Sequence, residues 1–313
     1  MASDPRLLLI IPLVAKLEKV SGRDKYIDET LKKLDSLLNN PSFALDAISA
    51  NEFGQQLAEA HFYCLCKEKN VELKKIPESE IKSPDFEVTT SKSPHYCEVK
   101  TPTFVGGIST ANQQLNEVME LRIQQEERLR QGASVASYAV EVRLYGDTEC
   151  SLTAWSNALL SKAKQLLHPG QFENGDTFLV LNLLLLTPFR TDSSAIRKKV
   201  HDPYLDMELS GQLWLLAFGE TTTPVYGLKD SLDQSDNREG DFGSSGILNE
   251  YPNVRGILVV VYPLQGDPRI FGLLRSKDLK NISATMSWVN RLCDGDLNDE
   301  NDSLSQRRVN RNP

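Results

Sequence analysis

The chain has 313 residues, 40% of them hydrophobic, which is enough to bury a sizeable core in one large or two modest domains. Its formal net charge of −8 at pH 7 argues against a protein that coats nucleic acid, because such proteins bind phosphate through clustered lysine and arginine. The five cysteines form no CxxC pair and have no histidine at zinc-binding spacing, so the sequence indicates neither a zinc site nor a disulfide framework.

The N-terminal segment, residues 1–48, is expected to be helical. Its apolar run at residues 7–15 is far shorter than the ~20 residues that span a bilayer, and Asp4 offsets the charge of Arg6 ahead of it. We therefore expect a protein with no membrane segment, located in the cytoplasm. The run is more typical of a helix that packs its apolar face on a second helix. The apolar residues expected on that second helix are Ile27, Leu31, Leu34 and Leu37.

A further helix is predicted over residues 50–66, where apolar side chains recur at helical spacing. The residues in this apolar stripe are Phe53, Leu57, Ala60 and Cys64. Glu52 and Glu59 lie seven residues apart, so both can fall on one face of the helix, two turns from each other.

Two acids and a lysine follow this helix. Asp85 opens an alternating apolar and polar run, and residues 92–94 (Lys-Ser-Pro) provide turn chemistry before the run that holds Glu98 and Lys100. Because side chains alternate along a strand, Glu98 and Lys100 share one face while Val99 turns away. A hairpin would bring Asp85 beside Glu98. Such a pair suits Mg²⁺, which takes one or two carboxylates and keeps several waters, and a nearby lysine can orient an attacking water.

Beyond this hairpin, a polar segment at residues 110–131 is expected to form a surface helix that ends at Gly132. Gln113 and Gln114 near its start are typical of a solvated surface, with support of a site as the alternative. Residues 138–145 alternate as a half-exposed strand does.

The second half of the chain continues the same core, which is expected to span residues 49–293. A helix is predicted at residues 154–167, and the almost wholly apolar residues 177–186 are typical of a strand covered on both faces. The apolar runs at 213–218 and 254–262 predict further strands. Residues 230–246 have the composition of a mobile insertion, and residues 294–313 that of a disordered tail.

The residues around Asp85, Glu98 and Lys100 resemble the PD-(D/E)xK nuclease superfamily, and the match includes Pro84. The resemblance covers about a third of the chain, residues 50–145, and rests on the order of helix, strand and hairpin as well as on the motif. It implies a restriction-endonuclease-like α/β/α core with a mixed central sheet, and hydrolysis of DNA with Mg²⁺ or Mn²⁺. RNA remains an alternative substrate.

The resemblance also implies a role for each site residue. Asp85 and Glu98 would ligate the metal, and the backbone carbonyl of Val99 would join them. Glu59 would complete the acidic cluster directly or through water, with Glu52 as the open alternative. Lys100 would orient the attacking water and offset charge on the phosphate.

Two further expectations concern partners. Arg197, Lys198 and Lys199 form a basic cluster that can track phosphates, although a solvated helix face is the commoner explanation for such a run. A two-fold homodimer would suit cleavage of both strands of a duplex. The alternative function is a nuclease fold that binds nucleic acid or protein without catalysis, which the acidic net charge favours.

Overall fold

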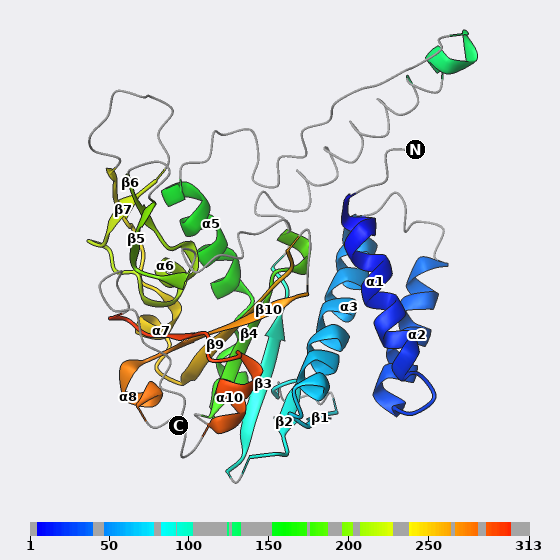
Figure 1. Ribbon diagram of the computed structural model, residues 1–313, viewed down its shortest axis with the longest axis horizontal. Helices are drawn as coiled ribbons and strands as arrows, with labels where there is room; N and C mark the ends of the chain where they lie inside the picture. The colour runs from blue at the N-terminus through cyan, green and yellow to red at the C-terminus, as the bar shows by residue number, and fades with distance from the viewer. Residues whose placement is uncertain are drawn as a thin grey trace.

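A mixed sheet of seven strands forms the centre of the molecule and is covered by helices on both faces (Figure 1). This computed structural model describes residues 5–39, 47–77, 83–91, 93–102, 124, 127–132, 152–173, 176–186, 196–202, 207–227, 238–263, 267–280 and 286–301. The predicted α/β class is therefore confirmed, and so is the mixed character of the sheet.

The strands of this sheet run in the spatial order β1 (Leu73–Lys75), β2 (Phe86–Val88), β3 (His95–Lys100), β4 (Thr177–Asn182), β9 (Val254–Val261), β10 (Arg269–Leu274) and β11 (Leu297–Asn298). β2 pairs antiparallel with both β1 and β3, so the predicted hairpin is confirmed. β3 then pairs in parallel with β4, and β4 in parallel with β9. Every residue of β4 is buried, as expected for a strand with helices on both faces.

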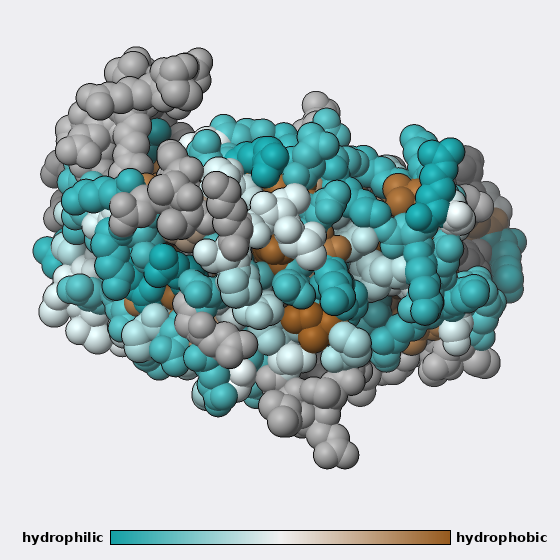
Figure 2. All heavy atoms as spheres, turned by 90° about the horizontal axis from the view of Figure 1, so that it is seen from below, coloured by the Kyte–Doolittle hydropathy of each residue, from teal (hydrophilic) through white to brown (hydrophobic). Residues whose placement is uncertain are grey.

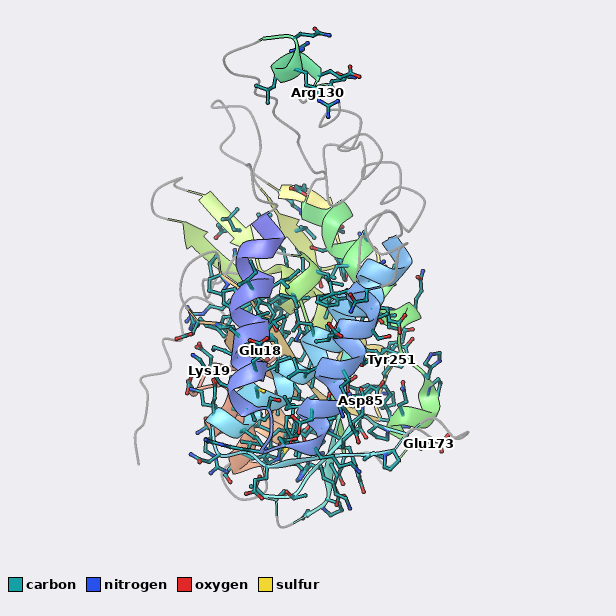
Figure 3. The ribbon with its side chains drawn as sticks, turned by 90° about the vertical axis from the view of Figure 1, so that its right-hand side faces the viewer. Glu18, Lys19, Asp85, Arg130, Glu173 and Tyr251 are labelled. Atoms are coloured by element: carbon teal, nitrogen blue, oxygen red, sulfur yellow. The ribbon has the colours of Figure 1, made fainter. Side chains whose placement is uncertain are left out.

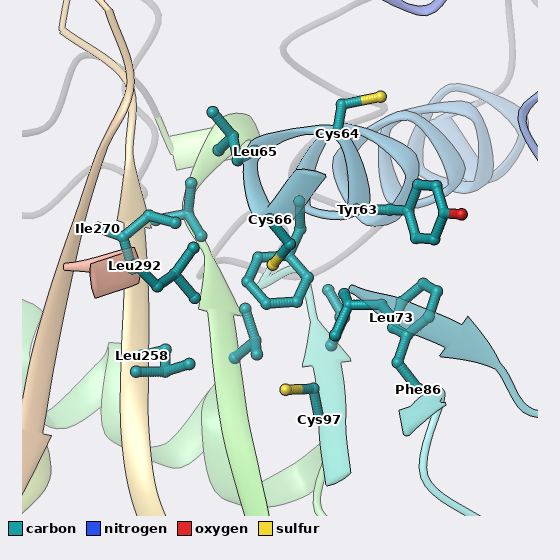
Figure 4. Packing of buried hydrophobic residues seen from close by; sticks show 14 of the residues in the cluster. Tyr63, Cys64, Leu65, Cys66, Leu73, Phe86, Cys97, Leu258, Ile270 and Leu292 are labelled. Atoms are coloured by element: carbon teal, nitrogen blue, oxygen red, sulfur yellow. The ribbon is translucent and has the colours of Figure 1, made fainter. Parts of the chain in front are cut away.

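One face of the sheet is covered by α3 (Ala47–Glu68), and α1 (Pro5–Val20) and α2 (Lys25–Leu38) pack on α3. Asp24 caps α2 by accepting hydrogen bonds from the backbone N–H groups of Tyr26 and Ile27, which would otherwise have no helical partner. The buried residues of these helices form one hydrophobic cluster with the sheet, which includes Phe86 and Phe178. Figure 4 shows Cys66 of α3 and Cys97 of β3 facing this cluster. The N-terminal helices thus share a core with the sheet.

The opposite face is covered by α5 (Leu152–Gln165), α6 (Gln212–Phe218) and α7 (Ile247–Glu250). These helices form a second hydrophobic cluster with the strand side chains that point to this face of the sheet. The strand predicted at residues 213–218 is wrong, because this segment is α6. All six of these residues are buried, and a short run that is apolar on every side has no periodicity to separate helix from strand. The helix ends where the N–H of Gly219 donates to the carbonyl of Leu215.

Two predicted irregular segments are partly ordered. β8 (Arg238–Asp241) lies in the insertion expected at 230–246 and pairs with β7 (Pro224–Tyr226), and the next residue, Phe242, is fully buried. In the expected tail, β11 pairs in parallel with β10. Local composition missed these contacts, because each depends on a partner distant in sequence. Residues 228–237 and 302–313 lie outside the described part of the chain.

The remaining short elements are η1 (Pro169–Phe172), η2 (Leu184–Leu186), β5 (Lys199–Asp202), β6 (Met207–Ser210), α8 (Ser276–Leu279) and α10 (Ser287–Leu292). The strand expected at 138–145 lies outside the described residues, and so does the helix expected at 110–131 except for residues 124 and 127–131. Gly132 follows that helix with φ 94°, in the left-handed region that glycine adopts without strain, so the predicted helix end is confirmed.

The described helices include none with both the length and the apolar composition needed to cross a bilayer. Figure 2 shows one face of the molecule, on which hydrophilic residues predominate and hydrophobic residues form small separate patches. This pattern is ordinary for a surface in contact with water.

Candidate active site

One cavity of about 440 Å³ brings together the acids and the lysine predicted from the sequence. Glu59 reaches it from α3, Asp85 from the residue before β2, and Glu98 and Lys100 from β3. Figure 3 shows Asp85 beside α3. Glu173, the residue after η1, is labelled on the same side of the molecule. Glu52 is exposed and is not among the lining residues, so Glu59 is the acid of α3 at this cavity.

Asp85 is held by two contacts. Its Oδ2 accepts a hydrogen bond of 2.8 Å from the backbone N–H of Val99. β2 begins at Phe86, which pairs with Cys97, so the pairing between β2 and β3 does not extend to Val99. The N–H of Val99 donates to the Asp85 side chain instead of to the backbone of β2. Oδ1 of Asp85 accepts from the ammonium of Lys75 at 3.1 Å. The backbone of β3 and the ammonium of Lys75 therefore fix this carboxylate, one at each oxygen.

Glu98 is the most buried of the acids, with only 1% of its side chain exposed. Its Oε1 lies 2.5 Å from the Lys100 ammonium and 2.5 Å from Nε2 of Gln171, which donates to it. Its Oε2 is buried and has no hydrogen-bond partner among the described residues. Burial raises the pKa of Glu98, the charge of Asp85 raises it further, and Lys100 offsets part of the rise, so that the pKa is about 7. The negative charges of Asp85 and Glu98 therefore repel each other, which is an electrostatic cost of this arrangement.

Glu59 is held by two donors. Its Oε1 accepts from the Lys75 ammonium at 2.7 Å and from the hydroxyl of Tyr26 at 2.8 Å. Burial alone would lower the pKa of Lys75, but the charges of Glu59 and Asp85 raise it above its ordinary value, which keeps this lysine cationic. Lys75 thus joins Glu59 to Asp85.

The sequence-based reasoning missed three residues with direct contacts here: Tyr26, Lys75 and Gln171. Lys75 follows Lys74 in a polar stretch typical of an exposed edge strand, and Gln171 follows the helix-breaking residues 168–170, so neither stands out by residue type. Alternation with the buried Leu73 was the one available signal for Lys75, because it places both on the same face of β1.

The donor set fits a single divalent cation with oxygen ligands. The described residues contain no cluster of three or more histidine, cysteine, aspartate or glutamate side chains arranged for a metal. Asp85 and Glu98 nevertheless meet the need of Mg²⁺ for one or two carboxylates, and the unpartnered Oε2 of Glu98 is a free ligand atom.

The basic cluster does not line this cavity. Residues 197–198 form a bend and Lys199 begins β5, so the helix face considered for them is wrong. Lys198 lies 5.3 Å from the centroid of the Trp214 ring, and Lys199 forms an ion pair of 2.6 Å with Glu208. Their contact with nucleic acid stays a prediction. Gln113 and Gln114 lie outside the described residues.

Comparisons of the chain with models of protein families, with curated proteins and with solved structures gave no significant match.

Proposed function

We propose that this protein is a nuclease of the PD-(D/E)xK type that hydrolyses phosphodiester bonds of DNA with Mg²⁺ or Mn²⁺. The observation that carries the proposal is the buried carboxylate of Glu98, which is repelled by the charge of Asp85. One of its oxygens is unpartnered among the described residues, and the other is paired to Lys100. A group kept in this position against its electrostatic cost is typical of a functional site. The restriction-endonuclease-like fold is part of the proposal, supported by the order of α3, β1 and the β2–β3 hairpin.

The proposed roles follow from the contacts. Asp85 and Glu98 would hold the cation, with the Val99 carbonyl as the third protein ligand. The bound cation would polarise the phosphate and lower the pKa of a water. Lys100 would orient the attacking water and offset charge on the phosphate, because its ammonium lies 2.5 Å from Glu98 at the cavity wall. Glu59 would act through Lys75, which ties it to Asp85.

DNA is the proposed substrate despite the acidic net charge. The charge that matters for phosphate is the charge at the cleft, where two lysines and a bound cation would offset the three carboxylates. The remaining surface can be acidic without preventing catalysis.

The test is a cleavage assay on plasmid, linear and single-stranded DNA in Mg²⁺, Mn²⁺ and chelator. Wild type should cut with either metal and not with chelator, and an RNA substrate in parallel tests the alternative. Asp85→Asn and Lys100→Ala should each lose at least about 100-fold in rate, the scale of losing one charge-stabilising group. Glu87→Gln, on β2 and outside the cavity lining, is the matched control and should retain activity. Full activity in Asp85→Asn under saturating Mg²⁺ would refute the proposal.

A binding module without catalysis is the second candidate. It is favoured by Lys75, whose ammonium already neutralises part of the acidic charge and so reduces the need for a metal. Calorimetric titration of the wild type with Mg²⁺ and Mn²⁺ separates the two. Absence of heat and of any thermal shift with both metals would support the binding module.

A further inference from the structure

Lys75 lies between the carboxylates of Glu59 and Asp85 and forms an ion pair with each. Its ammonium lies 2.7 Å from Oε1 of Glu59 and 3.1 Å from Oδ1 of Asp85. The side chain is 24% exposed, and the ammonium also lies 4.9 Å from the centroid of the Phe86 ring. It is therefore a half-buried cation with defined partners rather than a surface lysine.

Glu59, one of the two acids that contact Lys75, is itself held in place by a residue of α2. Tyr26, near the start of α2, donates its hydroxyl to Glu59 at 2.8 Å. The Tyr26 ring packs edge-on against Tyr63 and Phe86, with centroids 4.9 and 5.6 Å away. Glu59 consequently cannot swing away from Lys75 without breaking a second contact.

The charges at the cavity argue for one added cation. Among the described lining residues, the charged side chains are Glu59, Asp85, Glu98, Lys75 and Lys100. With Glu98 ionised they leave one net negative charge, which a single divalent ion converts to one positive charge. A second divalent ion would add two more positive charges beside a half-buried ammonium, which is unfavourable in a partly desolvated site.

We propose that Lys75 acts as a built-in cation in place of a second metal, so that the protein binds one divalent ion, at Asp85 and Glu98, and none between Glu59 and Asp85. This inference rests on the proposed metal-dependent function. It makes Lys75 and Tyr26 positioning residues, and it assigns Glu59 a structural partner instead of a metal.

The test measures how many Mn²⁺ ions bind, by calorimetry and by the electron spin resonance signal of free Mn²⁺. Wild type should bind one ion. Lys75→Met removes the ammonium with little change in side-chain length, and should bind two. Lys74→Met, the exposed neighbour on β1, and Lys75→Arg, which keeps the charge, should each bind one.

A second variant decides the matter if Lys75→Met does not fold. Glu59→Gln should change the Mn²⁺ dissociation constant by less than about threefold, because Glu59 does not hold the ion. Two ions bound by wild type, one ion bound by a folded Lys75→Met, or loss of binding in Glu59→Gln would each overturn this inference and leave the proposed nuclease standing. No ion bound by wild type would overturn both.

Discussion

Replacing Glu98 by glutamine should make the protein more stable at neutral pH while removing its metal site. Glutamine has nearly the same shape as the protonated acid, and its carbonyl can still accept from Lys100 and Gln171. What it lacks is the negative charge that burial and Asp85 disfavour. Residues selected for chemistry often lower stability in this way.

The magnitude follows from the pKa of Glu98. Folding raises it from an ordinary value of 4.5 to about 7, which corresponds to a cost on the order of 3 kcal/mol for keeping the carboxylate ionised. Between these two pH values the folded wild type binds more protons than the unfolded chain, so its stability falls as pH rises, by at most about 1.4 kcal/mol per pH unit. Above about pH 7 both states are ionised and the cost is constant.

The assay is urea unfolding of wild type and Glu98→Gln at several pH values between 4 and 9, with chelator present so that no cation contributes. The free energies of unfolding should be nearly equal at pH 4 and should diverge toward pH 8, where the variant is more stable by on the order of 3 kcal/mol. Glu87→Gln, which removes a charge from the adjacent strand, should stay within about 0.5 kcal/mol of wild type. A Glu98→Gln variant less stable than wild type at pH 8 would refute the reasoning.

Two further results are expected. Tyr26→Phe removes the hydroxyl that donates to Glu59 and should lower the free energy of unfolding by about 1.5–3 kcal/mol, whereas Tyr96→Phe, outside the cavity lining, should change it little in the same urea titration. Equal losses in the two variants would contradict the role given to the Tyr26 contact. Mg²⁺ affinity should rise about tenfold per pH unit up to about pH 7 and then level off, because the cation must displace the proton of Glu98. Calorimetry from pH 5.5 to 8.5 measures this, and an affinity independent of pH would be the contrary outcome.

The sequence was most informative where one local rule decided the structure. The hairpin between Asp85 and Glu98 follows from alternation and turn residues, and α3 follows from apolar spacing, so both could be predicted without tertiary knowledge. α6 could not, because a run buried on every side looks the same as helix or strand. The regular structure of residues 238–242 could not be predicted either, because the burial of Phe242 depends on packing against segments that are distant in sequence.

The same distinction separates the parts of the site. The motif residues carry a spacing that points to them, whereas Lys75 and Gln171 are common polar residues whose importance comes from what they touch. Tyr26 is the extreme case, because it lies 33 residues from its partner Glu59, in a helix that the sequence assigned to a separate segment. The balance of charges in a partly buried site is a property of the assembled fold, and no window of sequence contains it.

The N-terminal helices therefore have a consequence for the site beyond their contribution to the core. A hydrogen bond from Tyr26 holds Glu59, the Glu59 carboxylate holds the Lys75 ammonium, and Lys75 in turn contacts Asp85. Asp85 is anchored at its other oxygen by the backbone of β3. Because these contacts are in series, a displacement of α2 would reach Asp85 through only two intervening side chains. The position of one proposed metal ligand thus depends on the packing of α2 against α3.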